Sequence, residues 1–512
     1  MKITYLSHAT ILIETAGIKI LTDPWLVGSA YTEQWYLFPT PIANYESYLQ
    51  DIDYVLISHG HEDHLHLETL KKINKTATVF FPYTWFSGAK ELFAKLGFTN
   101  FIEVSNEKKY TIAHDTTVTF IANNLDNMLV IKSGAITLVD INDSLPAAPK
   151  AVITYFCEKI KKLFPTIDYV FCSHAGASYY PNTIQCDWKD DIAIGQIREL
   201  FFVDNFCRIV ESLSPTSAIP FGSDFILLDD NQRWINTVRY PRHELASYFN
   251  TYFPTSTTSI LESYAGDVIT DHQVTKNALY HTQCRNENID VLINNCYAQE
   301  IEKKRNRPTI SSTQWESLYE LVSKHILQKA AIVPLDKRKE LVFQVQITDA
   351  TNTDYITIDL TADVPRCSSS KELYKNSKLL VKIRSAILQK SITREWGGDS
   401  IVIGYGCEIV VYEKNTIVQQ LDNWAVLLLS QYPNTKSYVK KNPIRALKYL
   451  LNDDFKRKLF WNKLTKKQTD FAFFDPILKD ADLWFNRTNC EICRKCNLPL
   501  LDTIASQQIH NP

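Results

Sequence analysis

The fold is decided by residues 54–66, which read YVLISHGHEDHLH. The first five residues are an apolar run suited to a buried strand, and the rest form a polar loop that leads into a helix. His59 and His61 are two residues apart, so their side chains project to the same side of an extended segment. Asp63 and His64 follow in the turn and face the same point from another angle. These side chains are costly to bury together without a cation, and imidazole with carboxylate suits zinc or iron.

Two hairpins with the same plan lie on either side of this motif. Each has an apolar strand, a turn over glycine and a second strand that runs into an aspartate. The first hairpin turns at Gly17 and runs into Asp23, and the second turns at Gly134 and runs into Asp140. The repeat predicts two related β-rich halves that each deliver acidic residues at a strand end. Strands and helices alternate around the hairpins, which indicates a layered α/β domain.

The motif His-x-His-x-Asp-His at residues 59–64 resembles the signature of the metallo-β-lactamase superfamily. The resemblance implies an α/β fold with a four-layered αββα sandwich made of two similar halves. It also implies that Asp23 supports the site without binding metal. A bridging carboxylate is expected from Asp143, with Asp140 as the alternative. The metal ligands expected on this basis are His59, His61, Asp63, His64 and Asp143, and the expected catalytic residues are Asp63, His64 and Asp143.

Two histidines that the resemblance would supply are missing. Residues 121–126, before the second hairpin, contain none, and neither does the Pro-Phe-Gly stretch at 220–222. His66 and His174 are candidate substitutes as additional metal ligands, although hydrogen-bonded supporting roles explain them as well.

The missing histidines change the expected chemistry. One metal would keep His59, His61 and Asp143, and two histidines with one carboxylate suit non-haem iron that binds oxygen better than a zinc hydrolase site. The other metal would keep Asp63, His64 and a share of Asp143. Both one and two bound iron ions are compatible with this set, and zinc is the alternative metal.

Three longer stretches narrow the resemblance further. They are ISHGHEDHLHLETL at 57–70, HAGASYYP at 174–181 and WGGDSIVIGY at 396–405, and they resemble the CMP-N-acetylneuraminate hydroxylase family. That resemblance implies an iron-dependent monooxygenase that hydroxylates the N-acetyl group of a CMP-sialic acid. Those hydroxylases begin with a Rieske domain whose signature pairs Cys-x-His with Cys-x-x-His. This sequence contains no such pairing, so electrons are expected from a separate donor protein or from the substrate itself.

Composition restricts the partners and the compartment. With 55 basic and 57 acidic residues the net charge is -2, so neither a nucleic acid nor a membrane is expected as the main partner. The eleven cysteines do not resemble a secreted disulfide framework, and a reducing cytoplasm is therefore expected. The expected partner is a small-molecule substrate.

The chain is expected to divide into four parts. They are a metal-binding catalytic domain at 1–270, a mostly helical connector at 271–330, a smaller β-rich α+β domain at 331–435 and a basic helical tail at 436–512. In the third part, a strand is expected at IVIGYG (401–406) and helices around 370–390. The tail carries Cys490, Cys493 and Cys496, whose spacing suits an iron–sulfur cluster or a zinc site, with free thiols as the alternative.

These observations favour a metal-dependent oxygenase, with iron as its metal, that acts on a small polar substrate, anionic or nucleotide-linked. The alternative is a zinc-dependent hydrolase of a phosphoester, amide or lactone, in which the metal lowers the pKa of a bound water. A third hypothesis is a metal-free scaffold used for binding.

Overall fold

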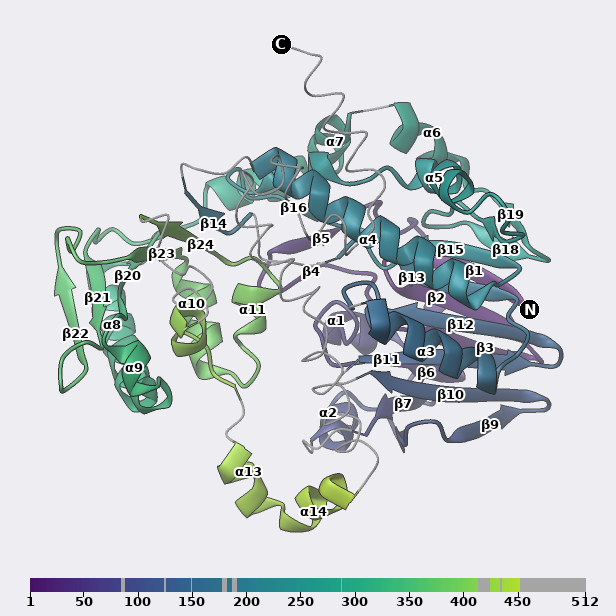
Figure 1. Cartoon of the computed structure of the whole chain (residues 1–512), viewed down its shortest axis with the longest axis horizontal. Coiled ribbons are helices and arrows are strands. Elements are labelled where there is room, and N and C mark those ends of the chain that lie inside the picture. Colours follow the sequence, from purple (N-terminus) through teal and green to yellow (C-terminus); the bar gives the residue numbers. More distant parts are fainter. Residues whose placement is uncertain are drawn as a thin grey trace.

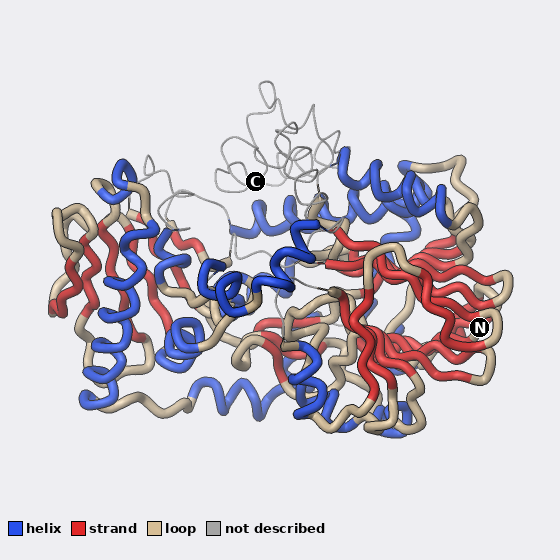
Figure 2. The backbone as a smooth tube through the Cα atoms, turned by 90° about the horizontal axis from the view of Figure 1, so that it is seen from below, coloured by secondary structure: helices blue, strands red, loops and turns tan. Residues whose placement is uncertain are grey.

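Two β-sheets that face each other form the first domain, as the computed structural model shows (Figures 1 and 2). The first sheet has the order β19-β18-β1-β2-β3-β6-β7-β8, and the second has the order β17-β15-β13-β12-β11-β10-β9. The strands of the first sheet are β1 (Lys2–Ser7), β2 (Thr10–Thr15), β3 (Ile18–Thr22), β6 (Tyr54–Leu56), β7 (Thr78–Pro82), β8 (Asn100–Val104), β18 (Val268–Thr270) and β19 (Gln273–Thr275). Those of the second are β9 (Lys109–Ala113), β10 (Thr116–Asn123), β11 (Asp126–Ser133), β12 (Ile136–Asn142), β13 (Tyr169–Ser173), β15 (Ser217–Phe221) and β17 (Ser259–Ile260).

The structure describes residues 1–83, 88–123, 126–148, 150–176, 182–186, 191–286, 288–412, 424–432 and 435–451.

Helices cover the outer face of each sheet. The first sheet packs on α1 (Leu67–Lys72) and α2 (Ala89–Lys95), and the second on α3 (Lys150–Leu163), α4 (Asp191–Leu213) and α5 (Leu245–Tyr252). Both faces of β11 are apolar for this reason. Leu129 and Ile131 point between the sheets, whereas Met128 and Val130 point toward the helices. The predicted αββα sandwich is confirmed.

The two hairpins form as the sequence predicts. β2 pairs with β3 and β11 with β12, each pair antiparallel. The turns need positive φ angles, and Gly17 and Gly134 adopt them at +76° and +58°.

A second domain is built around a six-stranded sheet of order β14-β24-β23-β20-β21-β22 (left in Figure 1). Its strands are β20 (Val342–Ile347), β21 (Tyr355–Asp359), β22 (Arg366–Ser370), β23 (Leu379–Ile383), β24 (Cys407–Val411) and β14 (Ile184–Gln185). β14 comes from the first domain, since it lies between β13 and α4 in the chain, yet it pairs in parallel with β24. Helices α8 (Ser312–Lys329) and α10 (Ser385–Thr393) pack on this sheet, and α6 (Ala278–Asn286) and α7 (Ile289–Arg305) precede them.

A three-stranded sheet lies between the two domains. It has the order β16-β5-β4 and consists of β4 (Ser29–Ala30), β5 (Trp35–Leu37) and β16 (Phe225–Leu227). Trp35 of β5 stacks on Phe225 of β16, with ring centroids 3.6 Å apart. This small sheet carries aromatic side chains toward the candidate site described below.

Two local predictions in the second domain are wrong in part. Of the predicted helices around 370–390, α10 forms from Ser385 onward, but 379–383 is a strand, β23, because this apolar run fills the place between β20 and β24 in the sheet. The stretch 401–406 was expected as a strand, but its first residues belong to the short helix α11 (Asp399–Val402). The rest of the stretch is a turn packed closely on the first domain, since a Cβ on Gly404 would lie 2.5 Å from the Cβ of Tyr31.

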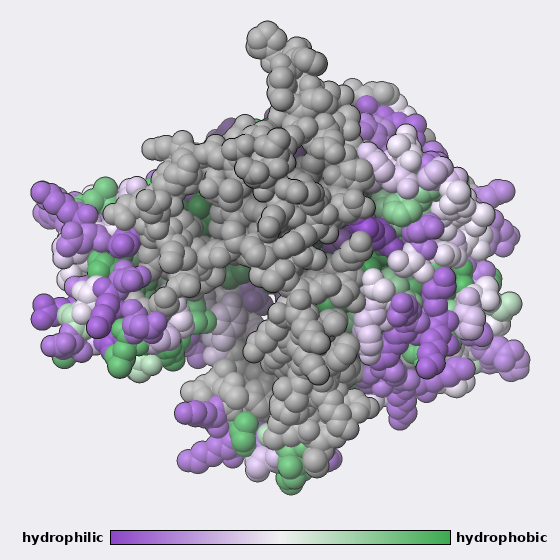
Figure 3. Space-filling view, viewed as in Figure 1, coloured by the Kyte–Doolittle hydropathy of each residue, from purple (hydrophilic) through white to green (hydrophobic). Residues whose placement is uncertain are grey.

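Two basic helices end the described chain, α13 (Thr435–Lys441) and α14 (Pro443–Leu451). Arg445 of α14 forms an ion pair with Glu103 of β8. On the face drawn in Figure 3, the described surface of both domains is mainly hydrophilic, with hydrophobic side chains in small separate patches. Every described helix is too short or too polar to cross a membrane.

Candidate metal centre

The histidine motif is held by hydrogen bonds where three strands end. Ser58 follows β6, and its backbone N–H and hydroxyl donate to the two carboxylate oxygens of Asp23, at 2.7 and 2.6 Å. The side-chain amide of Asn142, the last residue of β12, donates to Asp23 and, at 2.7 Å, to the hydroxyl oxygen of Ser58. Asp23 is fully buried and joins the ends of β3, β6 and β12 across the two sheets.

The same hydrogen bonds orient two imidazoles. Because the single hydroxyl proton of Ser58 goes to Asp23, Nδ1 of His59 must donate to the Ser58 oxygen, 2.9 Å away. Nδ1 of His64 lies 3.1 Å from a carboxylate oxygen of Asp23. In both rings Nε2 is therefore directed away from the support and toward the other residues of the motif. Carboxylates and hydroxyls that fix histidines in this way are typical of metal sites.

Three overlapping groups of histidine and aspartate lie where these nitrogens point. They are His8, Asp63 and His64; His59, His64 and Asp143; and His59, His61 and Asp126, and within each group the ligand atoms lie within 4.8 Å of one another. Nε2 of His64 is 3.3 Å from a carboxylate oxygen of Asp63 and 3.3 Å from one of Asp143.

The remaining imidazoles complete the cluster. Nε2 of His8 is 3.1 Å from Asp63 Oδ2. Nε2 of His59 lies 2.7 Å from Nδ1 of His61 and 3.9 Å from Oδ1 of Asp126. The described structure therefore brings together all five predicted ligands and adds two residues, His8 and Asp126, to them.

Burial and charge act differently on the groups of the cluster. Burial lowers the pKa of His59 to about 4 and raises the pKa of Asp126 to about 6. Burial also opposes protonation of His64, but Asp63, Asp143 and Asp23 together raise the pKa of this imidazole well above its usual value. His64 thus takes the positive charge that the surrounding carboxylates require. A metal ion would supply that charge instead, and binding it would release the proton. The donor set therefore fits a metal ion.

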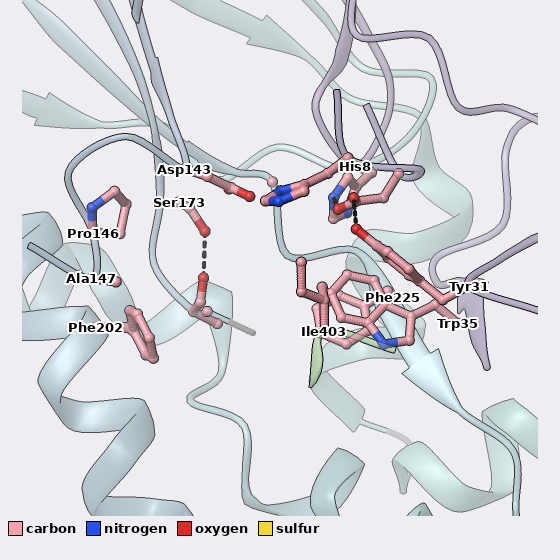
Figure 4. Close-up of a pocket in the computed structure, with 15 residues that line it drawn as sticks. His8, Tyr31, Trp35, Asp143, Pro146, Ala147, Ser173, Phe202, Phe225 and Ile403 are labelled. Atoms are coloured by element: carbon pink, nitrogen blue, oxygen red, sulfur yellow. Dashed lines mark hydrogen bonds and ion pairs between the residues drawn. The ribbon is translucent and has the colours of Figure 1, made fainter. Parts of the chain in front are cut away.

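A cavity of about 160 Å³ opens on this cluster (Figure 4). His8, His61, Asp63 and Asp143 line one part of it. Trp35, Phe225 and Ile403 lie side by side across the cavity from Asp143, with Tyr31 next to Trp35, whereas Phe202 lies near Ala147 on the Asp143 side (Figure 4). Ile403 belongs to the second domain, so both domains contribute to this cavity.

Two of the predicted additional ligands lie elsewhere. His66 caps the N-terminus of α1: its Nδ1 accepts from the backbone N–H of Thr69, and its Nε2 lies 3.3 Å from the carbonyl oxygen of Ser29. Nδ1 of His174, after β13, is 3.2 Å from the Ser223 hydroxyl. Neither histidine belongs to a potential metal-binding group among the described residues. Cys490, Cys493 and Cys496 lie outside the described residues.

His8 and Asp126 were missed because no spacing connects them to the motif. His8 lies in the turn between β1 and β2, with a φ of +43°. A positive φ at a residue that is not glycine marks a backbone held by its surroundings, but it is invisible in a single sequence. Asp126 begins β11, at the end of the stretch in which the expected histidine was absent. The carboxylate of Asp126 in that stretch is the one sequence feature that could have indicated a metal ligand there.

Comparisons with known proteins agree with the fold. The model of the beta-lactamase superfamily domain matches residues 2–135. A cytidine monophosphate-N-acetylneuraminic acid hydroxylase of Asterias rubens is 26% identical over 277 residues, which cover 50% of this chain and 39% of the hydroxylase. A protein of Mycolicibacterium smegmatis named as a Rieske 2Fe-2S iron–sulfur protein is 29% identical over 247 residues, 46% of each chain. The chain thus spans less than half the length of these relatives.

Two solved structures are distant matches. The diiron β-hydroxylase from Streptomyces venezuelae is 18% identical with a TM-score of 0.37, and the matched part covers 54% of each chain. An isothiocyanate hydrolase from Delia radicum gut bacteria is 16% identical with a TM-score of 0.38, covering 53% of this chain and 99% of the hydrolase. Residues 2–135 thus match the beta-lactamase superfamily domain, in agreement with the layered architecture, and about half of the chain is similar to the CMP-N-acetylneuraminate hydroxylases.

Proposed function

We propose that this chain is a metal-dependent oxygenase that uses non-haem iron. The observation that carries the proposal is the convergence of four histidines and three aspartates at one end of a cavity with largely apolar walls. The hydroxylase named among its relatives supports the same class of reaction.

The proposed ligands can be divided into two sets. His59, His61 and Asp126 would hold one ion, and His8, Asp63 and His64 would hold a second. Each set consists of two histidines and one carboxylate, a donor set that suits iron in oxygen-using enzymes. Asp143 is within ligand distance of both His59 and His64, so it is the carboxylate placed to serve both ions. Iron bound by these residues would supply the redox chemistry needed to activate oxygen.

The cavity walls suit a C–H bond better than a hydrolysable one. Trp35, Phe225 and Ile403 give this space apolar walls that would disfavour water there, and no lysine or arginine lines the cavity among the described residues. A hydrolase needs ordered water at its scissile bond, whereas an oxygenase benefits from its exclusion. The uncharged part of the substrate would enter the cavity, and an anionic or nucleotide-linked part would remain outside.

Electrons for the reaction are proposed to come from a separate donor protein. In a monooxygenase reaction one oxygen atom of O₂ enters the C–H bond and the other leaves as water, which consumes two electrons and two protons. A protein with a Rieske centre is the class of donor suggested by the mycolicibacterial relative.

Metal analysis combined with oxygen consumption tests the proposal. Protein purified without added metal is expected to contain up to two equivalents of iron, and to consume oxygen when given a chemical or protein reductant. His61→Ala should lose iron from the set it shares with His59 and Asp126. The matched control is His114→Ala, because the His114 side chain is 94% exposed and lies in a loop away from the cluster.

Two outcomes would overturn the proposal. Stoichiometric zinc with oxygen-independent turnover would favour the hydrolase instead. Unchanged metal content and activity in the His61→Ala variant would show that the cluster is not the metal site.

A further inference from the structure

The second domain touches the first at a loop beside the metal ligands. Gly404 of this loop packs against Tyr31, and a Cβ added to Gly404 would lie only 2.5 Å from the Cβ of Tyr31. The hydroxyls of Thr32 and Ser400 are 3.3 Å apart, and the side-chain amide of Gln232 donates to the carbonyl oxygen of Tyr405 at 2.7 Å. At Gly404 the absence of a side chain therefore permits a close approach of the two backbones.

Tyr31 connects this contact to the cluster. Its ring is almost fully buried, and its hydroxyl donates to Oδ1 of Asp63 at 2.5 Å. The other oxygen of the same carboxylate, Oδ2, faces His8 and His64 at 3.1 and 3.3 Å. Tyr31 therefore occupies one oxygen of Asp63 and leaves the other for the ligand set. The dashed line that ends at the Tyr31 hydroxyl in Figure 4 marks this bond between the phenol and the carboxylate.

Two further contacts come from the same side of the second domain. Ile403 forms part of the cavity wall opposite Asp143. Lys390 of α10 forms an ion pair of 2.9 Å with Glu62, the residue immediately before Asp63. The second domain thus contacts the histidine loop, the residue that holds Asp63 and the cavity itself.

We propose that the second domain completes the metal centre, and that Tyr31 is the positioning residue through which it acts. Docking of Gly404 on Tyr31 fixes the phenol, the phenol fixes the carboxylate of Asp63, and Ile403 closes the cavity. The inference rests on the proposed role of Asp63 as a ligand. It goes beyond that role because residues of the second domain then become part of the metal site.

Titration of the full-length apo protein with Co²⁺, followed by its visible absorption spectrum, tests this inference. Tyr31→Phe keeps the ring and removes only the hydroxyl, so it is expected to weaken one class of Co²⁺ site by about 10–100-fold and to change its visible spectrum. Gly404→Ala should act in the same direction by displacing Tyr31. Because Asp63 Oδ1 loses its donor, the melting temperature of apo Tyr31→Phe should fall modestly, while its unfolding should remain as cooperative as that of the wild type.

Gly406→Ala is the matched control. A Cβ there would meet the carbonyl oxygen of Ser400 at 2.5 Å, whereas one on Gly404 would meet the same oxygen at 2.8 Å, but only Gly404 also meets Tyr31. Gly406→Ala is therefore expected to lower thermal stability without changing the Co²⁺ affinity or spectrum.

The results separate two kinds of failure. If Tyr31→Phe and Gly404→Ala both bind Co²⁺ with wild-type affinity and spectrum while Asp63→Asn does not, the domain inference is wrong and the metal site stands. If Asp63→Asn also binds like the wild type, the assignment of the site itself is wrong.

Discussion

The two hairpins of the first domain deliver aspartates to the same place, but the two carboxylates have different surroundings. Asp23, after β3, has a side chain that is 0% exposed, and it accepts from Ser58, Asn142 and His64. Asp143, after β12, has a side chain that is 36% exposed, and it faces the cavity and His64. The ends of the two hairpins thus supply one residue that holds the framework and another that is exposed enough to bind an ion, although the hairpin repeat itself aligns Asp23 with Asp140, inside β12. The difference lies in how many buried donors surround each carboxylate.

Removing the carboxylate of Asp23 is expected to have the largest effect. Asp23→Ala leaves the buried donors of Ser58, Asn142 and His64 without an acceptor, and breaking a buried charged network of this kind costs about 3–5 kcal/mol. Urea unfolding of the apo protein measures the loss. A variant as stable as the wild type would contradict the framework role.

Asp143→Asn should change the stability of the apo protein little but should weaken metal binding strongly. Because the side chain is partly exposed and keeps its shape, the free energy of unfolding of the apo protein should change by less than about 1 kcal/mol. Metal affinity should nevertheless fall by more than the ~10–100-fold typical of residues that only support a ligand. Equilibrium dialysis against iron or Co²⁺ gives the affinity, and an unchanged value would remove Asp143 from the ligand set.

Ser58→Ala should cause intermediate losses of both stability and metal affinity. The Ser58 hydroxyl donates to Asp23 and accepts from His59, so its loss weakens both the framework and the orientation of one ligand. We expect a loss of about 1 kcal/mol in stability and about tenfold in metal affinity. Both measurements on the same variant would show whether framework and ligand set are coupled, and a change in stability alone would show that they are not.

His66→Asn should have the smallest effect on the site. Asparagine is also a favoured N-cap, so α1 should lose at most a few tenths of a kcal/mol, whereas His66→Ala should lose about 0.5–2 kcal/mol. Metal content should be the same in both variants and in the wild type. Loss of metal in either one would return His66 to the list of ligands.

The parts of the fold that the sequence predicts are those with a local signal. The hairpins follow from apolar strands around Gly17 and Gly134, and the motif at 59–64 follows directly from a buried strand. His8 and Asp126 have no such signal, because each comes from a separate strand end and meets the motif only through the packing of two sheets. For the same reason the stretch 401–406 was misassigned: its apolar residues suit a strand, but contacts with another domain determine its turn.

The short strand β14 means that the two domains cannot be separated at a single point in the sequence. This strand belongs to the first half of the chain, yet it covers the side of β24 that would otherwise be the end of the sheet. A fragment containing only the second half would expose the backbone N–H and C=O groups of β24, and such an edge invites pairing with other chains. A fragment containing only the first half would carry β14 with no sheet to join. We therefore expect either half to be prone to aggregation when expressed alone, even though each has a hydrophobic core of its own.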